Sequence, residues 1–85
     1  MHVTVRGRVQ GVGFRWATAE RARSRGVAGW VRNQPDGTVG AAFEGAPGAV
    51  DALVAWMRRG PSGARVDDVT VEQEAPVGES GFHAG

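Results

Sequence analysis

Apolar and polar residues alternate over residues 2–9, where Val3 and Val5 fall on the same side of the chain. This period of two predicts a half-buried β-strand. A glycine-rich break follows, and residues 14–25 are then rich in Ala and Arg and contain neither Pro nor Gly. We predict a helix over this range that ends at Gly26, because glycine is the residue that most readily closes a helix.

Two further strands are predicted at residues 27–33 and 38–44. The second of them places three apolar residues on one face: Val39, Ala41 and Phe43. The connection between them contains Pro35, which presets one backbone angle of a turn, and Gly37, which accepts a positive φ. The two strands therefore form a β-hairpin.

A second helix is predicted to begin at Pro47, since proline is common in the first turn of helices. Four apolar residues follow at the spacing i, i+3, i+4 and i+7, which is one stripe of a helix: Val50, Leu53, Val54 and Met57. Gly60 and Pro61 end the helix. Residues 66–74 carry one more strand pattern, and residues 78–85 either add a short edge strand or fray.

The predicted order is strand, helix, strand, strand, helix, strand, in a single domain that spans residues 1–85. This βαββαβ order is that of ferredoxin-like folds. These folds are α+β sandwiches within the broad α/β class, with helices packed on one face of a sheet. Two helices then cover one face of a largely antiparallel sheet. A chain of 85 residues has room for one hydrophobic core.

The composition narrows the possible functions. The chain has no cysteine, which excludes a disulfide framework and a thiolate metal site, and two isolated histidines make a poor metal site. There is no secretory signal pattern, and no apolar run approaches the ~20 residues of a membrane span, so we expect a cytoplasmic protein with no membrane partner. The formal net charge of +1 argues against nucleic acid as a partner.

A glycine-rich loop over residues 7–15 joins the first strand to the first helix. Gly11 and Gly13 allow successive backbone N–H groups to turn toward one centre, and the helix N-terminus adds free N–H groups and a partial positive charge. These groups favour an anion bound at that centre. Arg15 lies in the first helical turn, where its guanidinium can reach this anion. The loop is therefore a candidate anion site, the alternative being that its glycines only permit a tight turn.

Two familiar phosphate-binding motifs do not fit this loop. A P-loop requires a lysine, and the chain has none. The dinucleotide-binding pattern GxGxxG fails because Trp16 occupies the position of its third glycine.

The same loop carries a family resemblance. Residues 7–15, GRVQGVGFR, resemble the first signature of the acylphosphatases. Residues 29–33, GWVRN, followed by residues 35–37, PDG, resemble the second. Three later landmarks also match: Glu44-Gly45, the helix that contains Trp56, and Gly60-Pro61-Ser62. The resemblance thus covers nearly the whole chain.

The resemblance implies a ferredoxin-like enzyme that hydrolyses acyl phosphates to a carboxylate and inorganic phosphate without a metal or cofactor. It implies that Arg15 and Asn33 are catalytic, with Asn33 positioning the attacking water. The phosphate-binding loop corresponds to six residues: Gln10, Gly11, Val12, Gly13, Phe14 and Arg15. The expected partners are a small-molecule acyl phosphate and inorganic phosphate, which is both product and competitive inhibitor, and we expect a monomer.

Two other function classes stay open at the level of sequence. RNA-recognition domains share the element order, but they display aromatic residues on their central strands. Here these strands offer only Phe43, which alternation places with Val39 and Ala41. A non-catalytic regulatory or scaffold domain would also share the fold, and acylphosphatase-like domains occur inside larger carbamoyl-phosphate-processing proteins.

The three tryptophans have different expected places. Trp56 falls on the second helix and is expected in the core. Trp30 is expected to pack where the second strand meets a helix, since aromatic residues dominate small cores. Trp16 either caps the anion pocket or covers the margin of the sheet.

Overall fold

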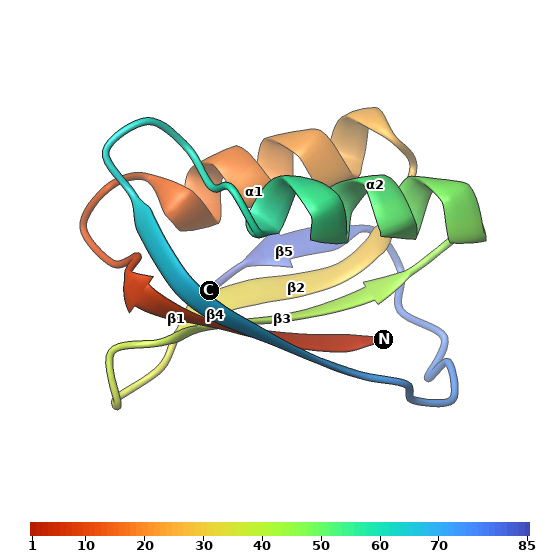
Figure 1. Ribbon diagram of the computed structural model, residues 1–85. Helices are drawn as coiled ribbons and strands as arrows, with labels where there is room; N and C mark the ends of the chain where they lie inside the picture. The colour runs from red at the N-terminus through yellow and green to blue at the C-terminus, as the bar shows by residue number, and fades with distance from the viewer.

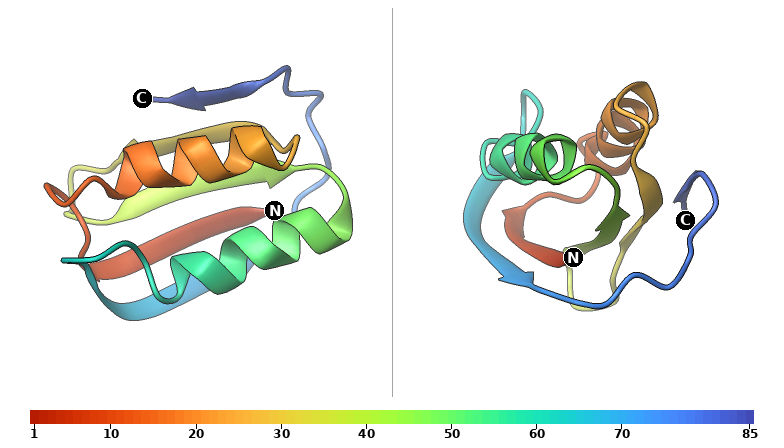
Figure 2. Two further views of the ribbon diagram at one scale, coloured as in Figure 1. Left: turned by 90° about the horizontal axis from the view of Figure 1, so that it is seen from above. Right: turned by 90° about the vertical axis from the view of Figure 1, so that its right-hand side faces the viewer.

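The computed structural model describes residues 1–85 and shows two helices lying across one face of a five-stranded sheet (Figures 1 and 2). The elements in chain order are β1 (His2–Arg8), α1 (Phe14–Ser24), β2 (Ala28–Asn33), β3 (Val39–Glu44), α2 (Pro47–Met57), β4 (Arg65–Glu72) and β5 (Phe82–Ala84). The strand order is β4-β1-β3-β2-β5, and every pair is antiparallel except β2 and β5. The ferredoxin-like fold is confirmed, and the tail adds the short edge strand. Neither helix has the length and apolar character that a membrane crossing requires.

The hydrophobic core lies between the helices and the sheet. The alternating positions of the two central strands face the helices and are buried: Val3, Val5, Val39, Ala41 and Phe43. The predicted stripe of α2 meets them from above: Val50, Leu53, Val54 and Met57. Each large apolar side chain buried in this way stabilises the fold by roughly 1.5–3 kcal/mol. Both central strands are therefore fixed in register by their inward faces.

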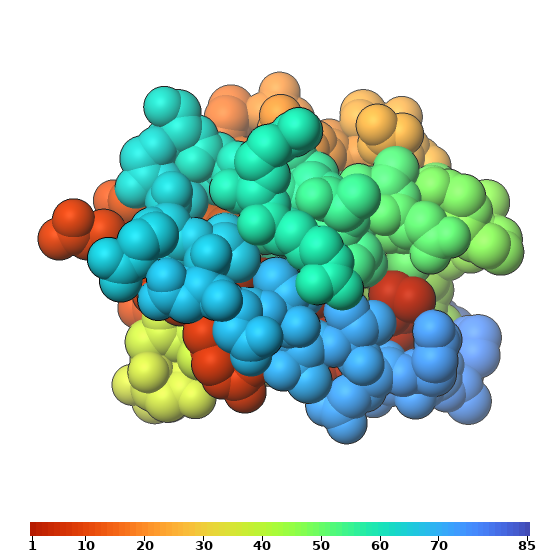
Figure 3. Space-filling model, viewed as in Figure 1, coloured from red at the N-terminus to blue at the C-terminus, as the bar shows by residue number.

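The segment 73–81 crosses from the β4 edge of the sheet to the opposite edge (Figure 2), and Figure 3 shows it in blue across the lower front of the molecule. The Glu44 carboxylate accepts hydrogen bonds from the backbone N–H groups of Glu79 at 2.9 Å and Gly78 at 3.1 Å. These bonds, that from Glu79 above all, lower the pKa of the Glu44 carboxyl. Glu44, at the end of β3, thereby holds the crossing segment against the sheet.

Strand β5 is held by its first residue. Phe82 is buried and stacks on Phe43 with 5.9 Å between the ring centroids. Arg23 of α1 donates from Nη2 to the Phe82 carbonyl oxygen at 2.9 Å. The strand has only three residues, so these contacts outside the sheet add to its short pairing with β2.

Trp30 does not pack against a helix, and that expectation was wrong. Its neighbours Gly29 and Val31 are buried, so alternation along β2 turns Trp30 to the open face of the sheet. There its ring meets His2 with 5.6 Å between centroids, and the Arg32 guanidinium lies 4.1 Å from the ring centroid. The indole is covered by polar neighbours because both helices lie on the other face.

Candidate active site

The glycine-rich loop turns from the end of β1 into α1 at the end of the molecule away from the N-terminus (Figure 1). Gly11 and Gly13 both have φ of 77°, a left-handed conformation that glycine adopts without the penalty other residues incur. Gly13 is also the N-cap residue of α1. A Cβ at either glycine would meet nothing within 4 Å, so the backbone angle and not crowding requires glycine here.

The loop offers a continuous run of unpaired backbone donors. The N–H groups of Gly11, Val12 and Gly13 donate to no acceptor within the protein. The first hydrogen bond of the helix runs from the Ala17 N–H to the Gly13 carbonyl oxygen at 3.0 Å. The amides of residues 14–16 precede it and are free as well. They lie at the positive end of the helix dipole, which favours an anion.

A hollow of about 330 Å³ lies over this loop. Arg15 and Asn33 contribute its only charged and amide side chains, and the rest of the lining is apolar or glycine: Val9, Gly11, Gly13, Phe14, Trp16 and Ala84. α1 packs against β2 and runs opposite to it, so the start of the helix lies beside the end of the strand. This arrangement brings the two residues expected to be catalytic to one hollow.

The expected loop residues Gln10 and Val12 are not among the residues that line the hollow. The Gln10 side chain turns to the β2–β3 hairpin, where Nε2 donates to the carbonyl oxygens of Gln34 and Thr38, both at 2.9 Å. Gln34 directly follows Asn33. Gln10 thus ties the anion loop to the strand end that carries Asn33.

We expect Gln10→Ala to lower the free energy of unfolding by about 1–2 kcal/mol, because two partly buried hydrogen bonds are lost. For the acyl phosphate hydrolysis that the family resemblance implies, it should also lower kcat/KM by about tenfold, since a loosened loop aligns the substrate poorly. Urea unfolding and steady-state hydrolysis measure the two effects. Gln73→Ala is the matched control, since Gln73 is exposed and its side chain makes no hydrogen bond. A Gln10→Ala enzyme with full activity would show that this tie does not align the loop.

The start of α1 is anchored in the core. Phe14 is buried, and its ring lies 5.5 Å from that of Trp56 on α2. Its carbonyl oxygen accepts a hydrogen bond from the buried Thr18 hydroxyl at 2.8 Å. The backbone amides of this turn therefore hold fixed directions, whereas the next side chain, Arg15, points outward to the hollow.

The tail strand contributes to the candidate site, and no motif in the sequence predicts this. Ala84 lines the hollow, and the Arg15 guanidinium donates from Nη1 to the Gly85 carbonyl oxygen. The Gly85 N–H in turn donates to the Val31 carbonyl oxygen at 2.8 Å. Trp16 is 70% exposed and stands at the rim, so it caps the hollow on one side instead of covering the sheet margin.

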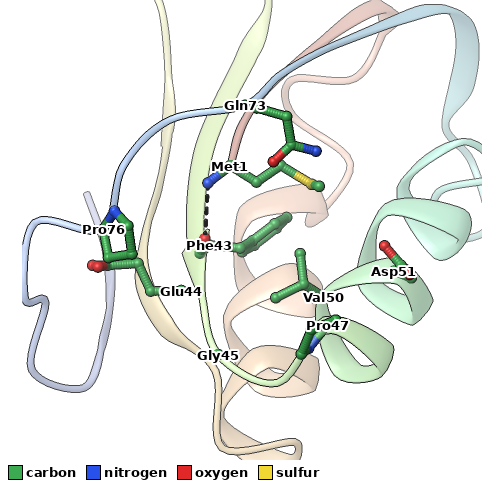
Figure 4. A pocket seen from close by; sticks show the side chains of 9 residues that line it. All are labelled: Met1, Phe43, Glu44, Gly45, Pro47, Val50, Asp51, Gln73 and Pro76. Carbon is green, nitrogen blue, oxygen red and sulfur yellow. Dashed lines mark hydrogen bonds between the residues drawn. The ribbon is translucent and has the colours of Figure 1, made fainter.

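Another hollow, of about 370 Å³, lies beside the N-terminus at the opposite end of the sheet (Figure 4). The Met1 amine donates to the Phe43 carbonyl oxygen at 3.2 Å. Glu44 and Asp51 stand on opposite sides of this hollow (Figure 4), and no guanidinium lines it. A phosphate group therefore fits the hollow over the glycine-rich loop and not this one. Nowhere in the molecule do three His, Cys, Asp or Glu side chains come together.

Solved structures with this fold share the arrangement of the whole chain. The crystal structure of acylphosphatase from Bacillus subtilis superimposes with a TM-score of 0.92 at 35% identity, over 99% of this chain and 94% of that chain. Full-length HypF, in its phosphate- and nucleotide-bound form, contains a similar region, with a TM-score of 0.90 at 25% identity. That region covers 99% of this chain but 11% of HypF. The same fold thus also occurs as a small part of a much larger protein.

The sequence comparisons agree with the structural ones. The profile of the acylphosphatase family matches residues 1–84. An acylphosphatase of Thermococcus kodakarensis is 56% identical over 81 residues, which is 95% of this chain and 89% of the relative. This chain belongs to the acylphosphatase family.

Proposed function

We propose that the hollow over the glycine-rich loop is where this enzyme cleaves the carboxyl–phosphate bond of an acyl phosphate. The observation that carries the proposal is the run of unpaired backbone amides at residues 11–16, which shares one hollow with Arg15 and Asn33. Directed donors and a guanidinium suit a tetrahedral dianion. The products are a carboxylate and inorganic phosphate.

The loop and Arg15 bind the phosphoryl group. Phosphoryl transfer passes through a loose transition state, so catalysis consists mainly of positioning and charge stabilisation. The amides of residues 11–16 donate to the equatorial phosphoryl oxygens, and the Arg15 guanidinium adds charge-assisted hydrogen bonds. Since these donors are fixed by the helix start and by Gln10, they need no reorganisation when charge develops.

Asn33 positions the nucleophile. Its amide accepts one hydrogen bond from a water molecule and donates another, which aims the water in line at phosphorus. The water oxygen forms the new P–O bond, and the bond from phosphorus to the acyl oxygen breaks, with its electron pair leaving on the carboxylate. The proton of the water passes to a phosphoryl oxygen of the substrate, because an amide is too weak a base to take it.

The acyl group leaves toward solvent. The hollow opens beside Trp16, whose side chain is 70% exposed, and the lining includes no polar side chain besides Arg15 and Asn33. Recognition is therefore concentrated on the phosphoryl group, and the enzyme accepts acyl phosphates with different acyl groups. We include in the proposal that a monomer acts without metal or cofactor.

Hydrolysis of benzoyl phosphate tests the proposal. We expect phosphate release well above the spontaneous rate, unchanged by excess chelator, and competitive inhibition by orthophosphate. Phosphate should also raise the melting temperature, since a ligand that binds only the native state stabilises it. A folded protein that binds phosphate but releases none from benzoyl phosphate would point instead to the regulatory or scaffold alternative.

A further inference from the structure

A second cationic site lies between the two helices, on the side that faces away from the sheet. Figure 2 shows α1 and α2 side by side and running in opposite directions. A groove of about 460 Å³ lies between them, lined by Arg21, Arg25, Ala52, Leu53, Ala55, Trp56 and Arg59. No residue of this groove belongs to the hollow over the glycine-rich loop.

The three arginines of the groove have no anionic partner. Both ion pairs of the molecule lie on the sheet: Arg6 with Asp68, and Arg65 with Asp67. The side chains of Arg21, Arg25 and Arg59 make no ion pair, all three residues are exposed, and no carboxylate lines the groove. Three positively charged side chains therefore line one groove that contains no negatively charged side chain.

The placement of these charges favours an anion that extends along the groove. Arg21 lies in the last turn of α1, and Arg25 directly follows the helix. Four residues of helix separate two side chains by about 6 Å along the axis. Like charges at this spacing repel each other, and a bound anion removes the repulsion. Arg59 lies just beyond the end of α2, and the small side chains of Ala52 and Ala55 occupy little of the groove.

The one aromatic residue of the groove is already covered. The Arg21 guanidinium carbon lies 4.3 Å from the centroid of the Trp56 ring, and Trp56 is 8% exposed. No aromatic face is left on which a nucleobase could stack. A ligand of this groove is therefore recognised by charge and by the bidentate fit of guanidinium to phosphate, and not by stacking.

We propose that this groove binds a linear inorganic polyphosphate of at least three phosphates. Such a chain carries a negative charge on every phosphate, so it can engage Arg21, Arg25 and Arg59 at once. A single orthophosphate offers only one phosphate to three guanidinium groups. The site is distinct from the catalytic one, and the proposal holds whether or not the enzyme turns over acyl phosphates.

The test is calorimetric titration of sodium tripolyphosphate into Arg15→Ala protein, which lacks the guanidinium of the catalytic hollow. In this background we expect Arg25→Gln/Arg59→Gln to weaken tripolyphosphate binding about tenfold, as two charge-assisted contacts are lost. The matched control is Arg6→Gln/Arg65→Gln, which removes the same charge from the sheet and should change the affinity little. Arg21 is left in place because its stacking on Trp56 also supports the helix pair.

Amide chemical shifts locate the ligand independently of the variants. Tripolyphosphate should shift the backbone amides of Ala52 and Ala55 in protein with the native groove. Equal weakening in the two double variants would overturn the proposal, since only bulk charge would then matter. Absence of binding, or shifts confined to the glycine-rich loop, would overturn it as well. Tighter binding of ATP than of tripolyphosphate would show that a nucleoside is recognised, against the proposed ligand.

Discussion

Replacing Arg15 with alanine should reduce the turnover of benzoyl phosphate by about 100- to 1,000-fold, the usual effect of removing one preorganised donor to a developing charge. It should also weaken orthophosphate inhibition, because a charge-assisted hydrogen bond contributes roughly 1.5–3 kcal/mol, or about 10- to 150-fold in affinity. Steady-state kinetics gives kcat, KM and the phosphate inhibition constant in one experiment. Both effects are expected of a guanidinium that contacts the phosphoryl group in the ground state and in the transition state.

Two control variants separate phosphate binding by Arg15 from a general effect of losing an arginine and from an effect on the tail. Arg58→Ala removes an exposed arginine at the end of α2 and should leave the kinetics unchanged. Arg15 also donates to Gly85, so its loss could act by loosening the tail. Arg23→Ala loosens the same tail by releasing the Phe82 carbonyl oxygen while Arg15 stays in place. If Arg23→Ala lost as much activity as Arg15→Ala, the effect would belong to the tail and not to phosphate binding.

The fold could be predicted from the sequence because each element has a pattern of its own. The period of two at Val3 and Val5, and the stripe of α2, fix which faces are buried before any tertiary structure is known. Trp30 was wrongly predicted to pack against a helix because large aromatic side chains usually lie in the core. The indole was expected in the core, but the side chain of Val31 faces the core at this part of β2. Trp30 is its direct neighbour, and two successive residues of a strand cannot share a face.

The candidate site could be predicted in part. The loop glycines and Arg15 stand at a strand-to-helix turn, and the family resemblance pointed to Asn33. The contribution of Ala84 and Gly85 could not be predicted, because a strand of three residues carries no periodic pattern and its position depends on distant contacts. The direction of the Gln10 side chain could not be predicted either. Strands have a period of two residues and helices one of 3.6, but a loop has no such period to set which way a side chain points.

Asn33 is the residue whose replacement should have the second large effect. We expect Asn33→Ala to lower kcat by about 100- to 1,000-fold, because the water is no longer aimed at phosphorus. In the proposed mechanism the amide contacts the water and not the phosphoryl group. The orthophosphate inhibition constant should therefore stay within about twofold of wild type, as for an interaction made only in the transition state. Benzoyl phosphate kinetics with added orthophosphate measures both quantities.

Asn33→Gln sharpens this test, because it keeps the amide but moves it outward by one methylene. Since about an ångström of misplacement can cost 100-fold, a water-positioning role predicts that Asn33→Gln stays close to the alanine variant in kcat. A role in binding phosphate predicts instead that the longer amide still reaches the anion and keeps its affinity. If Asn33→Ala and Arg15→Ala weakened orthophosphate inhibition equally, both residues would bind the phosphoryl group and the water would be oriented by other means.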